Sequence, residues 1–168
     1  GGKTYSSKDG VVYSADGTTL LYCPAEKTSI SFDKNTTTFG KYAFYKSKIN
    51  SMELPEKLET IGDAAFYSSS VKYLKFPDTV RKIGKNAFFN AAIQSVSLNE
   101  GLETIGGHAF SAAHIGGITI PASVKSIGEW NFDYDYGTDK YIVIKGSDTT
   151  IGTSAIPSWY AVDVYAPS

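Results

Sequence analysis

One nine-residue phrase occurs three times in this chain at a spacing of 22 residues, as LETIGDAAF (58–66), VRKIGKNAF (80–88) and LETIGGHAF (102–110). A fixed period in the twenties, with apolar residues at set offsets, is typical of a solenoid in which each unit stacks on the next. Aligned on the phrase, the chain divides into units at 27–48, 49–70, 71–92, 93–114, 115–136 and, after a two-residue insertion, 139–160. Because one unit is too small to form its own core, the repetition indicates units that bury their flanks against each other.

Each unit begins with a predicted short strand. Apolar residues occupy the fourth and sixth positions of the units, so two side chains point to the same side of the strand. Pro55, Pro77 and Pro121 follow at position seven, where a proline ends a strand because it cannot donate to the ladder. An Ile-Gly pair at positions 13–14 of most units is interpreted as a sharp bend in which the glycine supplies backbone freedom.

The end of each unit predicts a second kind of element. The sequences DAAF, KNAF and GHAF are expected to form one helical turn each, which points Phe66, Phe88 and Phe110 into the interior. The expected fold class is therefore an α/β-type solenoid. Short parallel strands would form one face, and short helical turns and loops the other.

The two ends of the chain differ from the repeats, as the ends of a solenoid do. Two strand-like runs flank Asp16-Gly17, which is a strong signal for an N-terminal β-hairpin. The sequence AVDVYAPS predicts a last short strand that closes the stack. We thus expect a single domain over 1–168, with a hairpin cap at 5–26, six repeats at 27–160 and a C-terminal cap at 161–168.

Charge and hydropathy argue against several classes of partner. The formal net charge is −1, from 16 basic and 17 acidic residues, so no electrostatic footprint for nucleic acid is visible. The apolar runs are too short for direct membrane insertion of this fragment. The single Cys23 cannot form an internal disulfide and is expected to be buried in a strand. Gly1 replaces an initiator Met, which suggests a fragment, so the missing signal sequence says nothing about export.

The repeats also resemble a known family. The segment LPEKLETIGDAAFYSSSVKYLKFPDTVRKIGKNAF (54–88) resembles the BspA-like bacterial leucine-rich repeats, and KDGVVYSADGTTLLYCPA (8–25) is similar to the segment that often precedes them. This resemblance implies a leucine-rich-repeat solenoid, an extracellular or cell-surface location, and adhesion or protein binding without catalysis. Family units are often 23 residues long with a Cys three residues after the Phe. Here that position holds Ser47, Ser69, Ala91 or Ala113.

No motif for catalysis or for a cofactor is visible, so we expect a protein that is not an enzyme and needs no cofactor. His108 and His114 could form a metal or catalytic pair, but no carboxylate or Cys stands nearby in the sequence, and surface polar residues are the other interpretation.

The segment DYDYGTDKY (133–141) contains the insertion and departs most from the repeat. Its first residues are Asp133, Tyr134, Asp135 and Tyr136, which we take as a candidate contact loop. Carboxylates at this spacing can hold calcium, but a calcium loop needs an acidic or amide residue at Gly137 and a Glu at Ile144. A solvated, aromatic-rich loop is the alternative.

The outward strand positions, three and five of each unit, predict a ligand face, because solenoids usually bind on the open face of their sheet. The candidate ligand face consists of Ser51, Glu53, Tyr73, Lys75, Ser95, Ser97 and Thr119. A column of aromatic residues at position 19, Tyr45, Tyr67 and Phe89, is expected to pack between coils, with a ligand platform as the alternative.

These observations leave three functions open. The preferred one is a non-enzymatic binding or adhesion module of a bacterial surface protein, with a protein or glycan partner from the extracellular surroundings of a host. A structural spacer is the first alternative, and a carbohydrate-active enzyme or accessory domain is the second. A glycosidase would need two facing carboxylates, and Glu53 is the one acid on the candidate ligand face.

Overall fold

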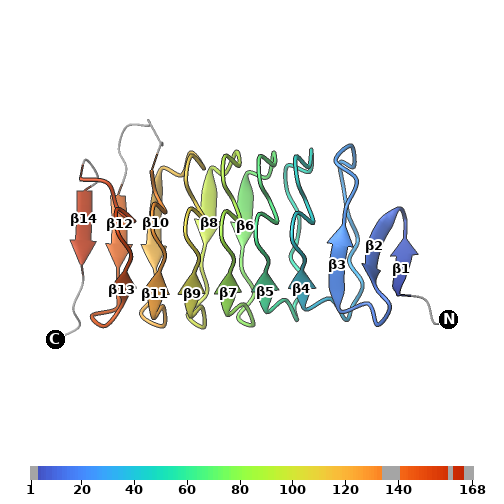
Figure 1. Cartoon of the computed structure of the whole chain (residues 1–168), viewed down its shortest axis with the longest axis horizontal. Helices are drawn as coiled ribbons and strands as arrows, with labels where there is room; N and C mark the ends of the chain where they lie inside the picture. Colours follow the sequence, from blue (N-terminus) through green and yellow to red (C-terminus); the bar gives the residue numbers. More distant parts are fainter. Residues whose placement is uncertain (1–3, 134–140, 159–160, 165–168) are drawn as a thin grey trace.

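The computed structural model of this protein describes residues 4–133 and 141–158, together with the backbone of 161–164. These residues form fourteen strands and no helix, wound into an elongated β-solenoid of stacked coils (Figure 1). The units that begin at residues 71, 93, 115 and 139 each contribute a short strand to both of two rows, the upper and lower rows of Figure 1. The units 27–48 and 49–70 contribute a strand to the lower row alone. The repeat predicted from the 22-residue period is thus confirmed.

The lower row is one nine-stranded sheet that runs along the whole solenoid. Its strands, in order, are β1 (Tyr5–Lys8), β2 (Val11–Ser14), β3 (Thr19–Tyr22), β4 (Thr38–Phe39), β5 (Thr60–Ile61), β7 (Lys82–Ile83), β9 (Thr104–Ile105), β11 (Ser126–Ile127) and β13 (Thr150–Ile151). From β3 onward every pairing is parallel and joins residues one coil apart, as with Ile61 and Ile83. The Ile of each Ile-Gly pair is therefore a strand residue, where the sequence predicted a bend.

The upper row contains the strands that the alternation at positions three to six predicted. β6 (Tyr73–Lys75) pairs with β8 (Ser95–Ser97), and an isolated bridge joins Ser51 to Tyr73. A separate sheet contains β10 (Gly117–Ile120), β12 (Tyr141–Ile144) and β14 (Ala161–Val164), all parallel. β6 and β10 both end directly before a Phe-Pro or a Pro, in agreement with the predicted strand stop.

The segment after each Ile-Gly pair is a series of turns, so the predicted helical turns are wrong. In the unit 49–70, the Ala65 N–H closes a turn onto the carbonyl of Gly62 (3.2 Å), whereas the Phe66 N–H bonds to the Ala87 carbonyl of the next coil (2.7 Å). In an α-helix both N–H groups would bond to the carbonyl four residues earlier. The α/β description is therefore corrected to an all-β solenoid.

Left-handed backbone at two fixed positions explains why no helix forms. The residues at position 16 of all six units and at position 20 of the first four have φ between 52° and 58°. They are Tyr42, Lys46, Ala64, Ser68, Asn86, Asn90, His108, Ala112, Trp130 and Ser154. A right-handed helix needs negative φ at every residue. One positive φ every four residues therefore reverses the chain, and the N–H groups of positions 16, 18 and 20 bond to carbonyls of the next coil.

The glycine of each Ile-Gly pair is required for a reason other than the one the sequence suggested. None of these glycines has a positive φ, so backbone freedom is not what they supply. Instead, a β-carbon at Gly62 would lie 2.5 Å from the Phe39 carbonyl oxygen, and one at Gly84 would lie 2.6 Å from the Asp63 nitrogen. Neighbouring coils approach so closely here that no side chain fits between them.

The core is a continuous aromatic and aliphatic interior. Successive phenylalanines at position 18 stack nearly parallel, with 4.7 Å between the ring centroids of Phe44 and Phe66 and 5.1 Å between those of Phe66 and Phe88. The stack continues to Phe110 and Phe132. The predicted inward direction of the Phe side chains is confirmed, since all five are buried.

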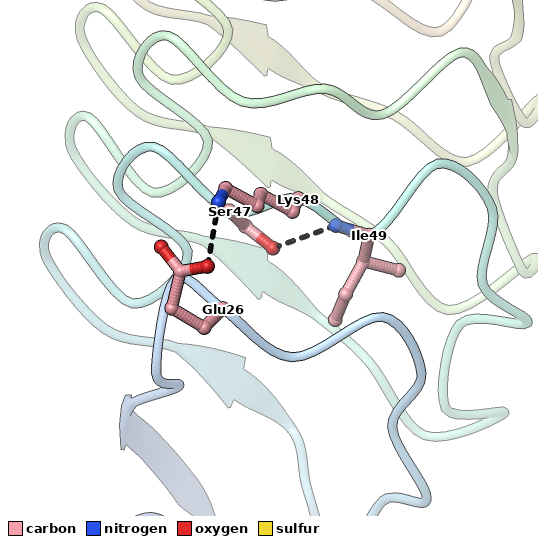
Figure 2. Close-up of polar contacts among 4 residues, drawn as sticks. All are labelled: Glu26, Ser47, Lys48 and Ile49. Atoms are coloured by element: carbon pink, nitrogen blue, oxygen red, sulfur yellow. Dashed lines mark hydrogen bonds and ion pairs between the residues drawn. The ribbon is translucent and has the colours of Figure 1, made fainter.

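The N-terminal end is an antiparallel meander that joins the coils through backbone and side-chain bonds. β2 and β3 form the hairpin predicted around Asp16-Gly17, and β1 extends it. Buried Cys23 donates its N–H to the Ala43 carbonyl (2.8 Å). Nearby, Glu26 and Lys48 form a solvent-exposed ion pair of 2.5 Å (Figure 2), which contributes about 1 kcal/mol or less at such a site.

Position 21, where family members often have Cys, is buried in this chain as well. Ser47 and Ser69 are 1% and 3% exposed, and Ala91 and Ala113 are fully buried. The Ser47 hydroxyl accepts a hydrogen bond from the N–H of Ile49 at 3.2 Å (Figure 2). A small side chain is needed here because the site lies inside the coil against the Phe stack.

Candidate functional site

Six of the seven residues of the candidate ligand face come together on the upper row of strands. β6 and β8 each expose their first and third residues and bury the second, so Tyr73 and Lys75 face outward around buried Leu74. The bridge from Ser51 to Tyr73 extends this alternation to the preceding coil. The result is a shallow hollow of about 570 Å³, lined by Ser51, Met52, Glu53, Tyr73, Leu74, Lys75, Ser95 and Ser97.

Tyr73 is the largest side chain of this strand-face hollow, and its position is fixed. It is 56% exposed, yet its hydroxyl donates a hydrogen bond to Gln94 Oε1 in the next coil at 2.5 Å. The phenol ring is thus held across two coils and is more than half exposed to solvent. Serine hydroxyls, one carboxylate and one ammonium lie beside the ring. The hollow can therefore both donate and accept hydrogen bonds, and the Tyr73 ring adds an apolar contact.

Thr119 does not join this hollow. It is exposed on β10, but β8 and β10 belong to different sheets, and Thr119 does not line the hollow. At the neighbouring outward position, Gly117 leaves room for the ring of Tyr141 from the next coil, with which a β-carbon would collide. The candidate ligand face is therefore interrupted after Ser97.

The candidate contact loop is placed only at its first residue. Asp133 is 8% exposed, and its backbone carbonyl accepts hydrogen bonds from the Ala112 N–H (2.8 Å) and the Ser111 hydroxyl (3.3 Å). Tyr134, Asp135 and Tyr136 lie outside the described residues, as does most of the calcium-like segment. Among the residues that the structure describes, no group of three or more His, Cys, Asp and Glu side chains could hold a metal ion.

The two histidines belong to one unit, with His108 in its turns and His114 two residues after the turns end. His108 is partly exposed and donates its N–H to the Glu129 carbonyl, and His114 is exposed. Both have left-handed backbone, with φ of 54° and 57°. His108 shares its left-handed backbone with the equivalent residues of neighbouring units, such as Asn86, whereas the residues equivalent to His114, Ser70 and Ala92, have no positive φ.

The position-19 aromatic residues pack between coils, as predicted. Tyr45 and Tyr67 have ring centroids 5.9 Å apart, and Tyr67 stacks on Phe89 at 4.9 Å with 16° between the planes. Sequence reasoning missed Tyr42, which adds its ring edge-on to Tyr45 at 5.7 Å. Tyr42, Tyr45 and Tyr67 line a second hollow of about 490 Å³ on the turn side of the coils. The sequence feature that could have pointed to this hollow is the pair of tyrosines spaced i, i+3 in one turn segment.

The family comparison agrees with the repeat geometry. The model of the BspA type leucine rich repeat region matches residues 19–139 in six copies. The chain belongs to this family. No curated protein matches the chain. Within the described residues, no helix has the length and hydropathy that a membrane span requires.

Solved structures share the solenoid fold of this chain at low sequence identity. A leucine rich cell surface protein of Faecalibacterium prausnitzii A2-165 aligns with a TM-score of 0.60 and 17% identity, over 98% of this chain and 40% of its own. A leucine-rich repeat protein of Eubacterium ventriosum aligns with a TM-score of 0.58 and 20% identity, over 94% and 52%. The pneumococcal vaccine antigen PcpA aligns with a TM-score of 0.52 and 19% identity, over 98% and 48%. This chain thus spans about half the length of these structures, and the likeness shows the fold.

Proposed function

We propose that this BspA-type solenoid is a binding module of a bacterial surface protein, and that it adheres to an extracellular protein through the strand-face hollow. The observation that carries the proposal is the set of six outward side chains, Ser51, Glu53, Tyr73, Lys75, Ser95 and Ser97, gathered around one hollow. Solenoids bind partners on such extended open faces.

The chemistry of the hollow suits a protein partner. Tyr73 supplies a rigid amphipathic ring, and aromatic side chains of this kind are enriched among the residues that dominate binding energies. Lys75 and Glu53 stand at the same position of neighbouring coils, so a partner could pair with both charges in a fixed order. Because Glu53 is the one acid among the described residues that line the hollow, these residues do not supply the two facing carboxylates of a glycosidase.

The surface location is part of the same proposal. One structural relative is described as a leucine rich cell surface protein and another as a vaccine antigen, and both share the coil geometry of this chain. A repeat array of this kind, displayed outside a bacterial cell, would present the hollow to host proteins. That the parent protein binds host proteins is proposed on the same grounds.

The test is binding of the purified protein to an array of extracellular-matrix and serum proteins. The variant Tyr73→Ala/Lys75→Ala removes the aromatic ring and the ammonium from the hollow. The matched control, Tyr22→Ala/Lys82→Ala, removes the same two residue types from exposed positions on the lower row of strands. We expect saturable binding that weakens at least tenfold in the first variant and is unchanged in the second.

Two outcomes would contradict the proposal. Binding that survives the Tyr73→Ala/Lys75→Ala change would place the site away from the strand-face hollow. Absence of binding to every protein on the array, with a circular dichroism spectrum that shows a folded chain, would favour the structural spacer.

A further inference from the structure

A second surface, separate from the strand face and rich in tyrosine, lies on the turns of the first two repeat units. Tyr42, Tyr45 and Tyr67 line its hollow of about 490 Å³, here called the tyrosine hollow. Tyr42 and Tyr45 are 48% and 41% exposed, and their rings meet at 86°. Two ring faces therefore form a corner, and Tyr67 continues one wall of it at 36° to Tyr45.

The backbone N–H groups of residues 42–46, below the tyrosine hollow, all donate hydrogen bonds to backbone carbonyls. The N–H groups of Tyr42, Phe44 and Lys46 bond to the carbonyls of Asp63, Ala65 and Tyr67 in the next coil, at 3.1, 2.7 and 2.9 Å. The Tyr45 N–H closes a turn onto the Tyr42 carbonyl at 3.1 Å. These bonds fix the directions in which the rings leave the coil. They also leave no row of free N–H groups to which an extended peptide could add as a strand.

Two ammonium groups stand over the outer rings. Lys41 Nζ lies 5.4 Å from the ring centroid of Tyr42, and Lys46 Nζ lies 5.2 Å from that of Tyr45. Contacts of this length are cation–π interactions, and they hold both side chains beside the hollow. Over residues 4–133 and 141–158, no carboxylate forms an ion pair with either ammonium. The rim of the hollow is therefore positively charged.

We propose that the tyrosine hollow binds an acidic sugar residue within a glycan, and that this site is separate from the strand-face hollow. A pyranose ring has a flat apolar face that fits an aromatic ring, while its hydroxyls can bond to the phenol oxygens. A carboxylate on the sugar would pair with Lys41 or Lys46. This mode of binding uses side chains alone, which is what the surface offers, whereas an acidic peptide would lack main-chain hydrogen bonds here.

The volume of the hollow agrees with an occupant of this size. Small-molecule sites range over roughly 300–1,000 Å³, so the hollow could take one or two sugar units. Because it is shallow and open, the affinity of a single unit should be low, and several units or several copies of the protein would be needed for firm attachment.

The experiment is an NMR titration of the isotope-labelled protein with sialyllactose and with a hyaluronan tetrasaccharide, both acidic, and with neutral lactose as the comparison. We expect saturable shifts of the Tyr42, Tyr45 and Tyr67 ring signals with the acidic sugars, and at least tenfold weaker binding of lactose. A Lys41→Gln/Lys46→Gln variant should lower the affinity for the acidic sugars toward that for lactose.

The ring variant is chosen so that the fold survives. Tyr42→Asn/Tyr45→Ala removes two walls, and Asn already occupies the left-handed position equivalent to Tyr42 at Asn86. We expect the sugar-induced shifts of the Tyr67 ring to disappear in this variant, with a circular dichroism spectrum like that of the unmodified protein as evidence of folding. Tyr73→Ala, on the strand face, should bind the sugars like the unmodified protein, so this site and the protein-binding site are tested independently.

Three results would overturn the assignment. They are no saturable shift with either acidic sugar, equal binding of lactose, or shifts of the same tyrosines with an acidic peptide but not with sugars. The last result would assign the hollow to a peptide partner.

Discussion

The backbone of Gly106 lies against that of Gly84 in the preceding coil, so that a β-carbon at Gly106 would be 2.6 Å from the Gly84 carbonyl carbon. The same closeness recurs two coils on, where a β-carbon at Gly152 would lie 2.7 Å from the Glu129 nitrogen. The nine-stranded sheet turns directly into the run of turns at this point, and its coils stay in register through bonds such as Gly106 N–H to the Ile83 carbonyl (2.9 Å).

We therefore predict that Gly106→Ala destabilises the protein, whereas Gly116→Ala does not. The added methyl at Gly106 would push two coils apart, with an expected loss of about 2 kcal/mol or more, as for other overpacked sites. A β-carbon at Gly116 would meet nothing within 4 Å. Urea unfolding of both variants gives the comparison, and equal stabilities would refute the close-approach explanation.

A second prediction concerns two equivalent serines that differ in hydrogen bonding. The buried Ser69 hydroxyl has no hydrogen-bond partner among the described residues, whereas Ser47 Oγ accepts from the Ile49 N–H. Ser69→Ala should raise the free energy of unfolding by about 1 kcal/mol, because it removes an unpaired buried polar group. Ser47→Ala should lower it by a similar amount, because the Ile49 N–H loses its acceptor. Thermal melting that showed the same sign for both variants would contradict this assignment.

The sequence predicted the coil well because its signals are periodic and chemical. The apolar alternation around Leu74 and the Pro at position 77 depend on rules that hold in any strand, and the structure agrees with both. The turns were missed because Ala64 and Ser68 carry no sign of positive φ: left-handed backbone is expected at Gly or Asn, not at these residues. Only the stacking of coils, which supplies bonds between them, makes that backbone favourable.

The candidate site divides in the same way. Residues three and five of each strand could be assigned to one face from the period of two alone, which placed Tyr73 beside Lys75 and one coil from Ser95. Two features depended on three-dimensional contacts instead. Thr119 is separated by the break between β8 and β10, and Tyr42 reaches Tyr45 only because the chain reverses at its left-handed backbone.

The hairpin turn gives a prediction about pH. The Asp16 carboxylate accepts hydrogen bonds from the Ser14 hydroxyl (2.6 Å), from the Thr18 N–H (3.0 Å) and from the Thr18 hydroxyl (2.9 Å). Led by the Ser14 hydroxyl, these bonds lower the pKa of Asp16 from its ordinary 3.8 to about 2. Since the folded-state pKa is depressed, the stabilisation is present above the ordinary pKa and is lost as the pH falls through about 2.

An NMR titration of the Asp16 carboxyl carbon should therefore show a midpoint near 2. Ser14→Ala should move the midpoint back toward the ordinary value, because it removes the largest of the three contributions. A midpoint close to 4 in the unmodified protein would show that these hydrogen bonds do not form in solution.

The thiol of Cys23 gives a prediction about reactivity. Burial raises the pKa of Cys23 from 9.0 to about 11, although the nearby charge of Lys27 opposes the shift. The thiolate is the reactive form, so native protein at pH 8 should react with a disulfide reagent far more slowly than the urea-unfolded chain. Because the folded-state pKa is raised, any stabilisation from this group is lost as the pH rises from about 9 toward 11. Equal rates in both states would mean that the segment around Cys23 opens freely.

The last prediction tests the left-handed turns with two neighbouring alanines. Ala112 has a φ of 53°, and Ala113 is fully buried without a positive φ. Ala112→Gly should stabilise the protein by about 0.5 kcal/mol, since relief of left-handed strain of about 1–2 kcal/mol exceeds the added flexibility of the unfolded chain. Ala113→Gly should destabilise it by about 1 kcal/mol or more, because flexibility is gained while a buried methyl is lost. Opposite shifts of the urea midpoint would confirm that Ala112 is held at a positive φ although alanine prefers a negative one. A decrease of the midpoint in both variants would indicate that the strain at Ala112 is negligible.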